Sequence, residues 1–298
     1  MKLATSTRIM GKSIDTQGPI PIEKSVRVCA EAGYRNLDAY LSGFCGPGQA
    51  MASDGWERWA QEIRALGEEL GVSFGQSHAY CTTGNVIRPD FTRPEGEFGE
   101  VLMQRCARAS QILGVSWMVV HPYSVLEGNG YDARKSFAFN REYFKRLGEE
   151  CSNRSVGIAI ENMTGATLYG RCVESLLALI NAIDNPMVQI CIDTGHAHLE
   201  GNDVATMIRQ VGRHLRATHI ADNHRNRDEH FAPFNGTIRW DEVMAALKEM
   251  DYQGCFAFEI PNLTSMYPKE LHPHLVTFSY ELGEHLLRMP FDKGEARV

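Results

Sequence analysis

The sequence is short of basic residues. It carries 30 lysines and arginines against 37 aspartates and glutamates, which gives a formal net charge of −7 at pH 7. Proteins that bind a nucleic-acid backbone or an anionic membrane usually present a positive surface, so this balance argues against both partners. The sequence also lacks an apolar run of membrane-spanning length and the apolar core of an N-terminal secretory signal. We therefore expect a cytoplasmic protein with no membrane role.

Paired cysteines and nucleotide-binding motifs are missing as well. The eight cysteines are scattered singly, without a Cys-x-x-Cys pair, which favours reduced core thiols over a disulfide framework or a thiolate zinc site. A glycine-rich dinucleotide fingerprint or a P-loop would favour an open doubly wound sheet, and neither is present. Because no linker or composition break divides the chain, we expect residues 1–298 to form one domain.

What the sequence does contain is a regular alternation of apolar runs and helical patterns. Such runs fit strands buried on both faces of a parallel sheet, and Gly33, Gly71 and Gly114 each stop a predicted helix. The predicted strands cover residues 2–9, 34–38, 72–78, 115–121, 156–161, 187–193, 215–220 and 255–260. The predicted helices cover residues 22–32, 56–70, 98–113, 133–151, 173–183, 203–214, 241–250 and 269–288. This alternation indicates an α/β protein built as a single (β/α)8 TIM barrel.

The last six predicted strands end in residues that can bind metals. In a parallel barrel all strand C-termini open onto one face, so these side chains should converge. In chain order they are His78, His121, Glu161, Asp193, His219 and Glu259. Three carboxylates and one imidazole, from Glu161, Asp193, His219 and Glu259, suit a hard or borderline ion. We expect one divalent metal, Mn²⁺ first, with Co²⁺, Mg²⁺ and Zn²⁺ as alternatives.

Other polar residues near these strand ends have several interpretations. His78 and His121 could bind metal, hold a substrate or be hydrogen-bonded core residues. His196 follows Asp193 in the loop over the barrel mouth, where it could hold substrate or a further metal. The polar loop at residues 220–230 could bring a cation to a substrate hydroxyl or phosphate, or it could simply be solvated.

Five short motifs are similar to those of the xylose-isomerase-like TIM-barrel superfamily, which contains sugar isomerases and epimerases together with endonuclease IV. They are Ile-Glu-Asn-Met at 160–163, Ile-Asp-Thr-Gly-His at 192–196, Ile-Ala-Asp-Asn at 220–223, Asn-Gly-Thr-Ile-Arg-Trp at 235–240 and Phe-Glu-Ile-Pro at 258–261. The site pattern most resembles ketose 3-epimerases, in which a Glu-Asp-His-Glu set binds one divalent metal, commonly Mn²⁺ or Co²⁺. The resemblance implies that Glu161, Asp193, His219 and Glu259 are the ligands, and that His196 and Arg225 hold the substrate.

These residues predict an isomerase of carbohydrate metabolism. A metal that chelates neighbouring oxygens of a ketose stabilises an enediolate, which makes the adjacent carbon acidic enough for a carboxylate to deprotonate. Glu161 and Glu259 could act as the acid and base on opposite faces of that carbon. We expect a ketose epimerase or an aldose–ketose isomerase that binds a small sugar or sugar derivative. A homodimer or a homotetramer is compatible with the sequence.

Other functions fit the same barrel. The resemblance to endonuclease IV implies a multi-zinc phosphodiesterase with additional ligands at His78, His121, His196, Asp228 and His230. The acidic balance and the lack of basic residues just after His78 and His121 argue against this nuclease. A lyase or dehydratase could use the same enediolate, and a barrel could bind metal without catalysis.

Overall fold

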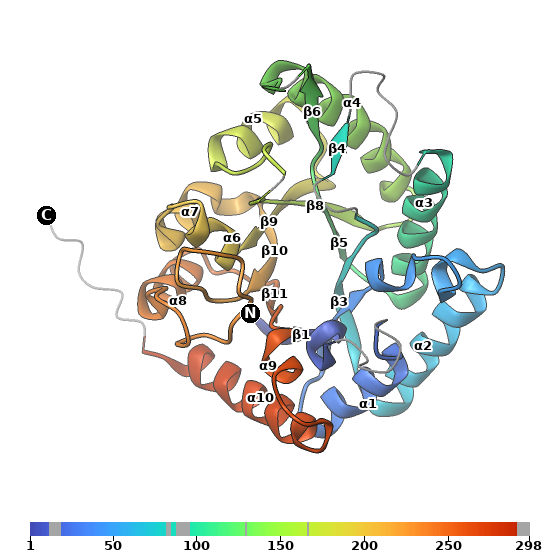
Figure 1. Cartoon of the computed structure of the whole chain (residues 1–298), viewed down its shortest axis with the longest axis vertical. Helices are drawn as coiled ribbons and strands as arrows, with labels where there is room; N and C mark the ends of the chain where they lie inside the picture. Colours follow the sequence, from blue (N-terminus) through green and yellow to red (C-terminus); the bar gives the residue numbers. More distant parts are fainter. Residues whose placement is uncertain (12–18, 82–84, 88–95, 129, 166, 291–298) are drawn as a thin grey trace, which may run out of the picture.

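The computed structural model describes residues 1–11, 19–81, 85–87, 96–128, 130–165 and 167–290. Within these residues, eight parallel strands form a closed barrel in the order β1-β11-β10-β9-β8-β5-β3-β2 (Figure 1). The strands are β1 (Lys2–Ser6), β2 (Asn36–Tyr40), β3 (Ser73–His78), β5 (Trp117–Val120), β8 (Gly157–Glu161), β9 (Val188–Asp193), β10 (Leu215–Ile220) and β11 (Cys255–Phe258). The predicted TIM-barrel fold is confirmed.

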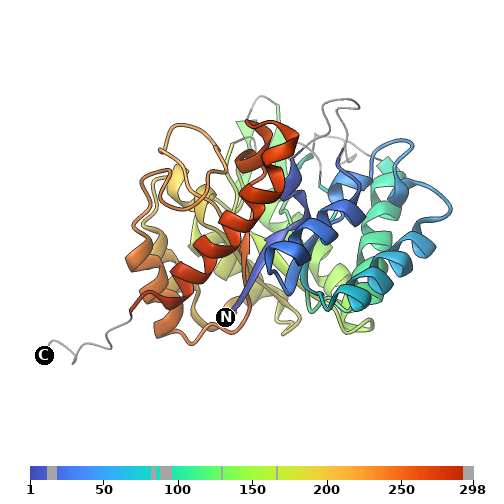
Figure 2. The same ribbon diagram turned by 90° about the horizontal axis from the view of Figure 1, so that it is seen from below.

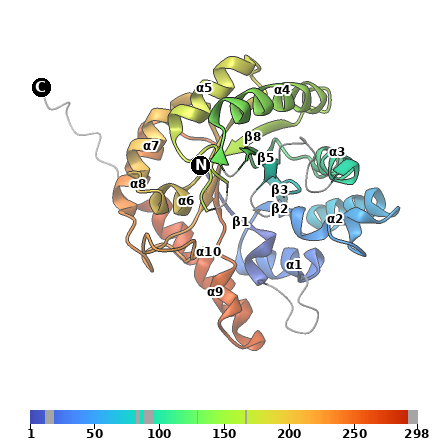
Figure 3. The ribbon, with the colours of Figure 1, turned by 45° about the horizontal axis from the view of Figure 1, so that its top comes forward.

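Helices surround the strands as an outer ring (Figures 1 and 3). They are α1 (Ile22–Ala32), α2 (Trp56–Leu70), α3 (Gly96–Leu113), α4 (Ala133–Ser152), α5 (Val173–Ile183), α7 (Val204–Val211), α8 (Trp240–Glu249) and α10 (His272–Arg288). The last helix lies beside α1 on the outside of the barrel (Figure 2). Tyr34 joins these two parts of the chain, because its hydroxyl lies 2.8 Å from Ser279 Oγ and its ring packs edge-on against Tyr280. None of the described helices could cross a membrane.

Several strand boundaries differ from the prediction, and two of the shifts have clear local reasons. The second strand begins at Asn36 rather than at Tyr34, because the amide of Tyr34 donates to the Cys29 carbonyl and so completes the end of α1. The first strand ends at Ser6, whose hydroxyl accepts from the amide of Arg8 and starts a 3₁₀ turn over Thr7–Met10. Both shifts matter for function, since they place Arg8 and Tyr40 at the barrel mouth.

The loops at the C-terminal ends of the strands carry short elements that the sequence pattern did not predict. A small sheet joins β4 (Val86–Ile87), β6 (Ser124–Glu127) and β7 (Gly130–Tyr131). Two short helices, α6 (Thr194–Leu199) and α9 (Asn262–Ser265), follow β9 and the end of β11. Further 3₁₀ turns cover Ser42–Phe44 and Ala50–Ala52, whereas Gly212–His214 and Lys269–Leu271 are 3₁₀ turns at the ends of two predicted helices. These pieces are too short to show hydrophobic periodicity, and two of them, the turn at Ser42–Phe44 and α6, contribute side chains to the site described below.

Candidate metal centre and active site

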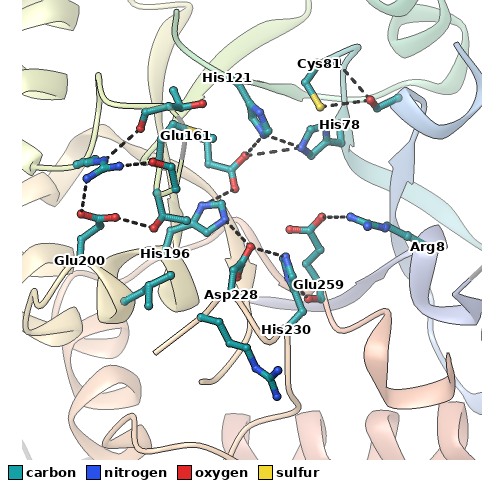
Figure 4. A pocket seen from close by; sticks show the side chains of 18 of the residues that line it. Arg8, His78, Cys81, His121, Glu161, His196, Glu200, Asp228, His230 and Glu259 are labelled. Carbon is teal, nitrogen blue, oxygen red and sulfur yellow. Dashed lines mark hydrogen bonds and ion pairs between the residues drawn. The ribbon is translucent and has the colours of Figure 1, made fainter. Parts of the chain in front are cut away.

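A cavity of about 860 Å³ opens at the C-terminal ends of the barrel strands. Its floor and walls carry charged and polar side chains that come from both halves of the barrel (Figure 4). This is the face on which TIM barrels place their functional groups. All of the predicted strand-end residues except Asp193 and His219 line the cavity directly, and those two lie fully buried beneath it.

The four predicted ligands meet at one point. Glu161, Asp193, His219 and Glu259 each offer one ligand atom, and these atoms all lie within 4.8 Å of one another. Nδ1 of His219 lies 2.8 Å from Oε1 of Glu161 and 3.4 Å from Oε2 of Glu259. Strand pairing explains part of this convergence, because His219 on β10 stands directly beside Asp193 on β9.

Two buried carboxylate oxygens in this group are not fully satisfied within the described part of the chain. Oδ2 of Asp193 has no hydrogen-bond partner there, although Oδ1 of Asp193 accepts from the amide of His196 at 2.7 Å, and Oε2 of Glu161 has only the imidazoles of His78 and His121 as ion-pair neighbours. A buried ionised oxygen without a partner is unfavourable unless a cation or donor satisfies it. The donor set therefore fits a divalent ion of hard or borderline character.

Neighbouring residues hold the ligands in position. The side chain of Asn162 accepts from the amide of Asp193 at 2.7 Å and donates to its carbonyl at 3.0 Å. Nε2 of His219 lies 3.0 Å from Oδ2 of Asp38, which also accepts from the Gln76 amide at 2.9 Å. A carboxylate on one imidazole nitrogen directs the other nitrogen to the metal, so Asp38 orients His219.

The ligands have strongly shifted pKa values. Burial would raise the pKa of Glu161, but His219 and His121 beside it hold that pKa well below its usual range. Burial raises the pKa of Asp193 to about 6. Burial would lower the pKa of His219, but Glu161 and other anionic neighbours raise it well above the usual value. The metal-free centre therefore holds protons that a bound ion would displace.

His78 and His121 form a second group beside Glu161. Their Nε2 atoms lie 3.1 Å apart, and Nε2 of His121 lies 3.0 Å from Oε2 of Glu161. Burial and the neighbouring His121 lower the pKa of His78. Burial would lower the pKa of His121, but Cys81 and Glu161 raise it to about 10. The structure thus brings both histidines to the same carboxylate.

His196, Asp228 and His230 form a third group. Oδ2 of Asp228 lies 3.4 Å from Nε2 of His196 and 3.0 Å from Nε2 of His230. The other nitrogen of each imidazole lies 2.9 Å from a backbone carbonyl, that of Asn162 or Glu259. Burial would raise the pKa of Asp228, but the two histidines hold it far below its usual range. Burial would lower the pKa of His230, which Asp228 raises to about 9.

Arg225 does not reach the central cavity. Its Nε lies 3.2 Å from Nδ1 of His198, and both residues line a neighbouring cavity of about 410 Å³ together with Thr237. The backbone of Arg225 has a left-handed φ of 62°, and its amide donates to the Asn223 side chain. This turn directs the side chain away from the barrel axis. Arg227 lines the central cavity instead.

Sequence reasoning missed several residues in or beside the cavity. Arg8 stacks over the Tyr40 ring at 5.0 Å and lies 3.7 Å from Oε1 of Glu259. Asp38 lies behind His219, and Cys81 lines the wall near His121. Asp38 ends the second predicted strand and Arg8 lies near the end of the first, so extending the strand-end argument to all eight strands would have found them. Cys81 follows His78 by three residues and carries no sequence signal.

Comparisons with known proteins agree with this architecture. The family model described as a xylose isomerase-like TIM barrel matches residues 26–279. The L-ribulose 3-epimerase of Methylomonas sp. (strain DH-1) is 25% identical over 242 residues, which cover 79% of this chain and 77% of that protein. The crystal structure of a D-tagatose 3-epimerase-like protein superposes with a TM-score of 0.72 at 21% identity, covering 96% of this chain and 97% of the other.

A nuclease is also among the similar proteins. The probable endonuclease 4 of Acholeplasma laidlawii (strain PG-8A) is 29% identical over 147 residues, and the match spans about half of each chain, 48% of both. Ketose 3-epimerases, which are isomerases, recur among both the sequence relatives and the structural neighbours. The family model covers most of the chain, and the barrel and its motifs agree with it. The chain therefore belongs to the xylose isomerase-like TIM barrel family.

Proposed function

We propose that this protein is a cytoplasmic, divalent-metal-dependent sugar isomerase or epimerase that acts on a small sugar or sugar derivative. The observation that carries the proposal is the pairing of Glu161 and Glu259 around His219 at the floor of a large polar cavity. Glu161 ends β8 and Glu259 directly follows β11, and these two strands are separated in the barrel by β9 and β10. They therefore approach the bound substrate from different sides.

The two glutamates supply the proton transfers. Glu161 lines the cavity, and its Oε2, which has Nε2 of His121 as a neighbour at 3.0 Å, can take a proton from the carbon beside a ketose carbonyl. Glu259 delivers a proton to the opposite face in an epimerase, or to the neighbouring carbon in an isomerase. A divalent ion held by Glu161, Asp193, His219 and Glu259 would supply Lewis acidity that stabilises the enediolate. Mn²⁺ is the ion we favour, with Co²⁺, Mg²⁺ and Zn²⁺ as alternatives.

The cavity walls supply the groups that hold the sugar. His196, His78 and His121 line the cavity and can hydrogen-bond to sugar hydroxyls. Arg8 and Arg227 bring positive charge to the same space. The role predicted for Arg225 would require the loop at residues 220–230 to turn its side chain toward the cavity. In the conformation described, Arg8 and Arg227 are better placed to meet an anionic or hydroxyl-rich substrate.

One observation favours a second candidate, a multi-zinc phosphodiesterase. The groups His78–His121 and His196–Asp228–His230 adjoin the central ligands, so nine ligand-type residues border one cavity. Several metal ions there would activate water and stabilise a leaving phosphate oxygen. The net charge of −7 argues against an enzyme that binds the phosphate backbone of DNA. A lyase or dehydratase would share the enediolate chemistry of the first proposal.

A paired assay separates the two candidates. The Mn²⁺-loaded protein is incubated with a panel of free ketoses, and the Zn²⁺-loaded protein is incubated with duplex DNA that contains one abasic site. We expect an epimeric ketose or an aldose to form in the first reaction and the DNA to stay intact in the second. Cleavage at the abasic site without conversion of any ketose would replace the isomerase with the nuclease.

A further inference from the structure

Cys81 lies on the cavity wall beside two histidines (Figure 4). Its sulfur and one nitrogen each of His78 and His121 all lie within 4.8 Å of one another. We propose that these three residues form a cation site with a thiolate ligand, next to the carboxylate-rich centre. The ion it takes is soft or borderline, such as Zn²⁺, Fe²⁺ or Co²⁺, because a thiolate with two imidazoles disfavours Mg²⁺ and Mn²⁺.

The orientation of His78 suits a ligand. Its Nδ1 lies 2.9 Å from the carbonyl of Ala79, to which it donates its proton in the neutral ring. This hydrogen bond leaves the lone pair of Nε2 directed at His121, 3.1 Å away. Metal-binding histidines commonly donate their second nitrogen to a backbone carbonyl in this way, because the bond fixes both the tautomer and the ring plane.

The surroundings of Cys81 suit a thiolate. Oγ of Ser42 accepts from the backbone amide of Cys81 at 3.3 Å and lies 3.3 Å from its sulfur. Because the amide occupies one lone pair of this hydroxyl, its proton is free to point at the sulfur and stabilise negative charge there. Cys81 is also partly exposed, so an ion can reach it from the cavity. The sequence had favoured core thiols throughout, and Cys81 and Cys172 are the two that are not buried.

The proposed site adjoins the central one through Glu161. Oε1 of Glu161 lies 2.8 Å from His219, and Oε2 lies 3.0 Å from His121. One carboxylate therefore lies between a ligand set rich in oxygen and a ligand set with sulfur and nitrogen. The two sets should select different ions, a hard one in the centre and a softer one beside it. This selectivity does not depend on the proposed sugar chemistry.

Cobalt reports directly on thiolate ligation. Metal-free protein is titrated with Co²⁺, and the near-ultraviolet thiolate-to-cobalt charge-transfer band is recorded. We expect the band to saturate at one Co²⁺ with thiolate ligation per chain and to disappear in Cys81→Ser. It should persist in Cys172→Ser, which changes an exposed cysteine, and in Cys191→Ala, which removes the barrel-core thiol near His219. A wild-type protein that binds Co²⁺ without the band, or a band that survives Cys81→Ser, overturns the proposal.

Alkylation of the unmodified chain gives an independent measurement. Iodoacetamide labelling of the native protein is followed at Cys81 by peptide mass spectrometry, with Zn²⁺ or Mg²⁺ present. We expect Zn²⁺ to slow labelling of Cys81 about tenfold or more, because a thiolate that is bound to a metal ion is not available to attack iodoacetamide. Mg²⁺ should have no effect, and Cys172 should be labelled equally in both. Equal labelling of Cys81 in Zn²⁺ and Mg²⁺ would contradict the site. Neither readout measures turnover. The thiolate site can therefore be contradicted without contradicting the isomerase proposal, and the reverse also holds.

Discussion

At the scale of single residues, the site is built from imidazoles whose second nitrogen is already engaged. His219 faces Asp38, His78 faces the Ala79 carbonyl, and His196 and His230 face backbone carbonyls as well. These contacts fix ring orientation before any ion binds, which reduces the reorganisation that binding requires. The carboxylates between the rings are stabilised by these imidazoles, because each buried negative charge needs a positively charged or hydrogen-bond-donating neighbour.

Glu161→Gln and Glu259→Gln should each reduce ketose turnover by about 10²- to 10⁴-fold, the usual contribution of a positioned acid or base. The amide is nearly the same size as the carboxylate but cannot accept the proton. Turnover is measured with the metal-loaded protein at saturating ketose. Glu62→Gln, on the exposed face of α2 where the residue pairs with Arg58, serves as the matched control. Near-full activity in either site variant would remove that glutamate from the proposed pair.

Asp38→Asn should weaken metal binding by about 10- to 100-fold, the range found when a partner of a metal-bound histidine is changed. The neutral amide can still accept from His219, but it no longer stabilises positive charge on the ring. Isothermal titration with Mn²⁺ gives the dissociation constant directly. Asp54→Asn, at an exposed position before α2, is the control. An unchanged constant in Asp38→Asn would mean that Asp38 has no orienting role.

The residue types of the central ligands could be predicted from sequence, whereas the backbone groups that hold the neighbouring histidines could not. Strand ends on one face of a barrel predict that Glu161, Asp193, His219 and Glu259 converge, and the structure brings them together. Backbone carbonyls that hold histidines leave no trace in the sequence, because every residue has one. The direction of Arg225 was equally hidden, since it depends on the left-handed turn that follows Asn223.

At the scale of elements, one buried aspartate organises the long loop between β10 and α8. Oδ1 of Asp222 accepts from the amides of Asn223 and Ile238, and Oδ2 accepts from the amide of Phe234 and from Nε1 of Trp240. Gly236 passes so close that a Cβ there would lie 2.3 Å from Oδ1 of Asp222. The motifs at 220–223 and 235–240 thus fold the loop that carries Asp228 and His230.

Asp222→Ala should lower the free energy of unfolding by about 3–5 kcal/mol, because it leaves several buried N–H groups without an acceptor. Urea unfolding of the metal-free protein, followed by circular dichroism, measures the change. Asp54→Ala removes an exposed aspartate and should change the free energy by less than about 0.5 kcal/mol. If the two variants unfold at the same urea concentration, Asp222 does not organise the loop.

At the scale of the whole molecule, the barrel brings charged side chains from distant parts of the sequence together at the C-terminal end of its strands. Its alternating pattern made the fold predictable, since each strand and helix is long enough to show its period. The small sheet of β4, β6 and β7 was not predictable, because two-residue strands have no period to detect. The family match over residues 26–279 agrees with the barrel. The homodimer or homotetramer remains a prediction. The assignment of residues 1–298 to one domain also remains a prediction.

Removing metal should lower the melting temperature of the whole chain. An ion at about 100 times its dissociation constant stabilises the native state by about 2.7 kcal/mol, which corresponds to about 4 °C for a chain of 298 residues. The physical source is the cluster of buried carboxylates, in which Oδ2 of Asp193 has no hydrogen-bond partner among the described residues. Differential scanning calorimetry in Mn²⁺ and in chelator measures the shift. Identical transitions in both buffers would mean that no ion binds tightly at the centre.

The measurement that tests the central claim most directly is solvent-deuterium exchange into free ketoses. The Mn²⁺- or Co²⁺-loaded protein is incubated in D₂O with each ketose, and NMR records deuterium at the carbon beside the carbonyl. We expect at least one ketose to gain deuterium there, and Glu161→Gln to abolish the gain. Protein that demonstrably holds metal but introduces no deuterium into any ketose would contradict the proposed enediolate chemistry.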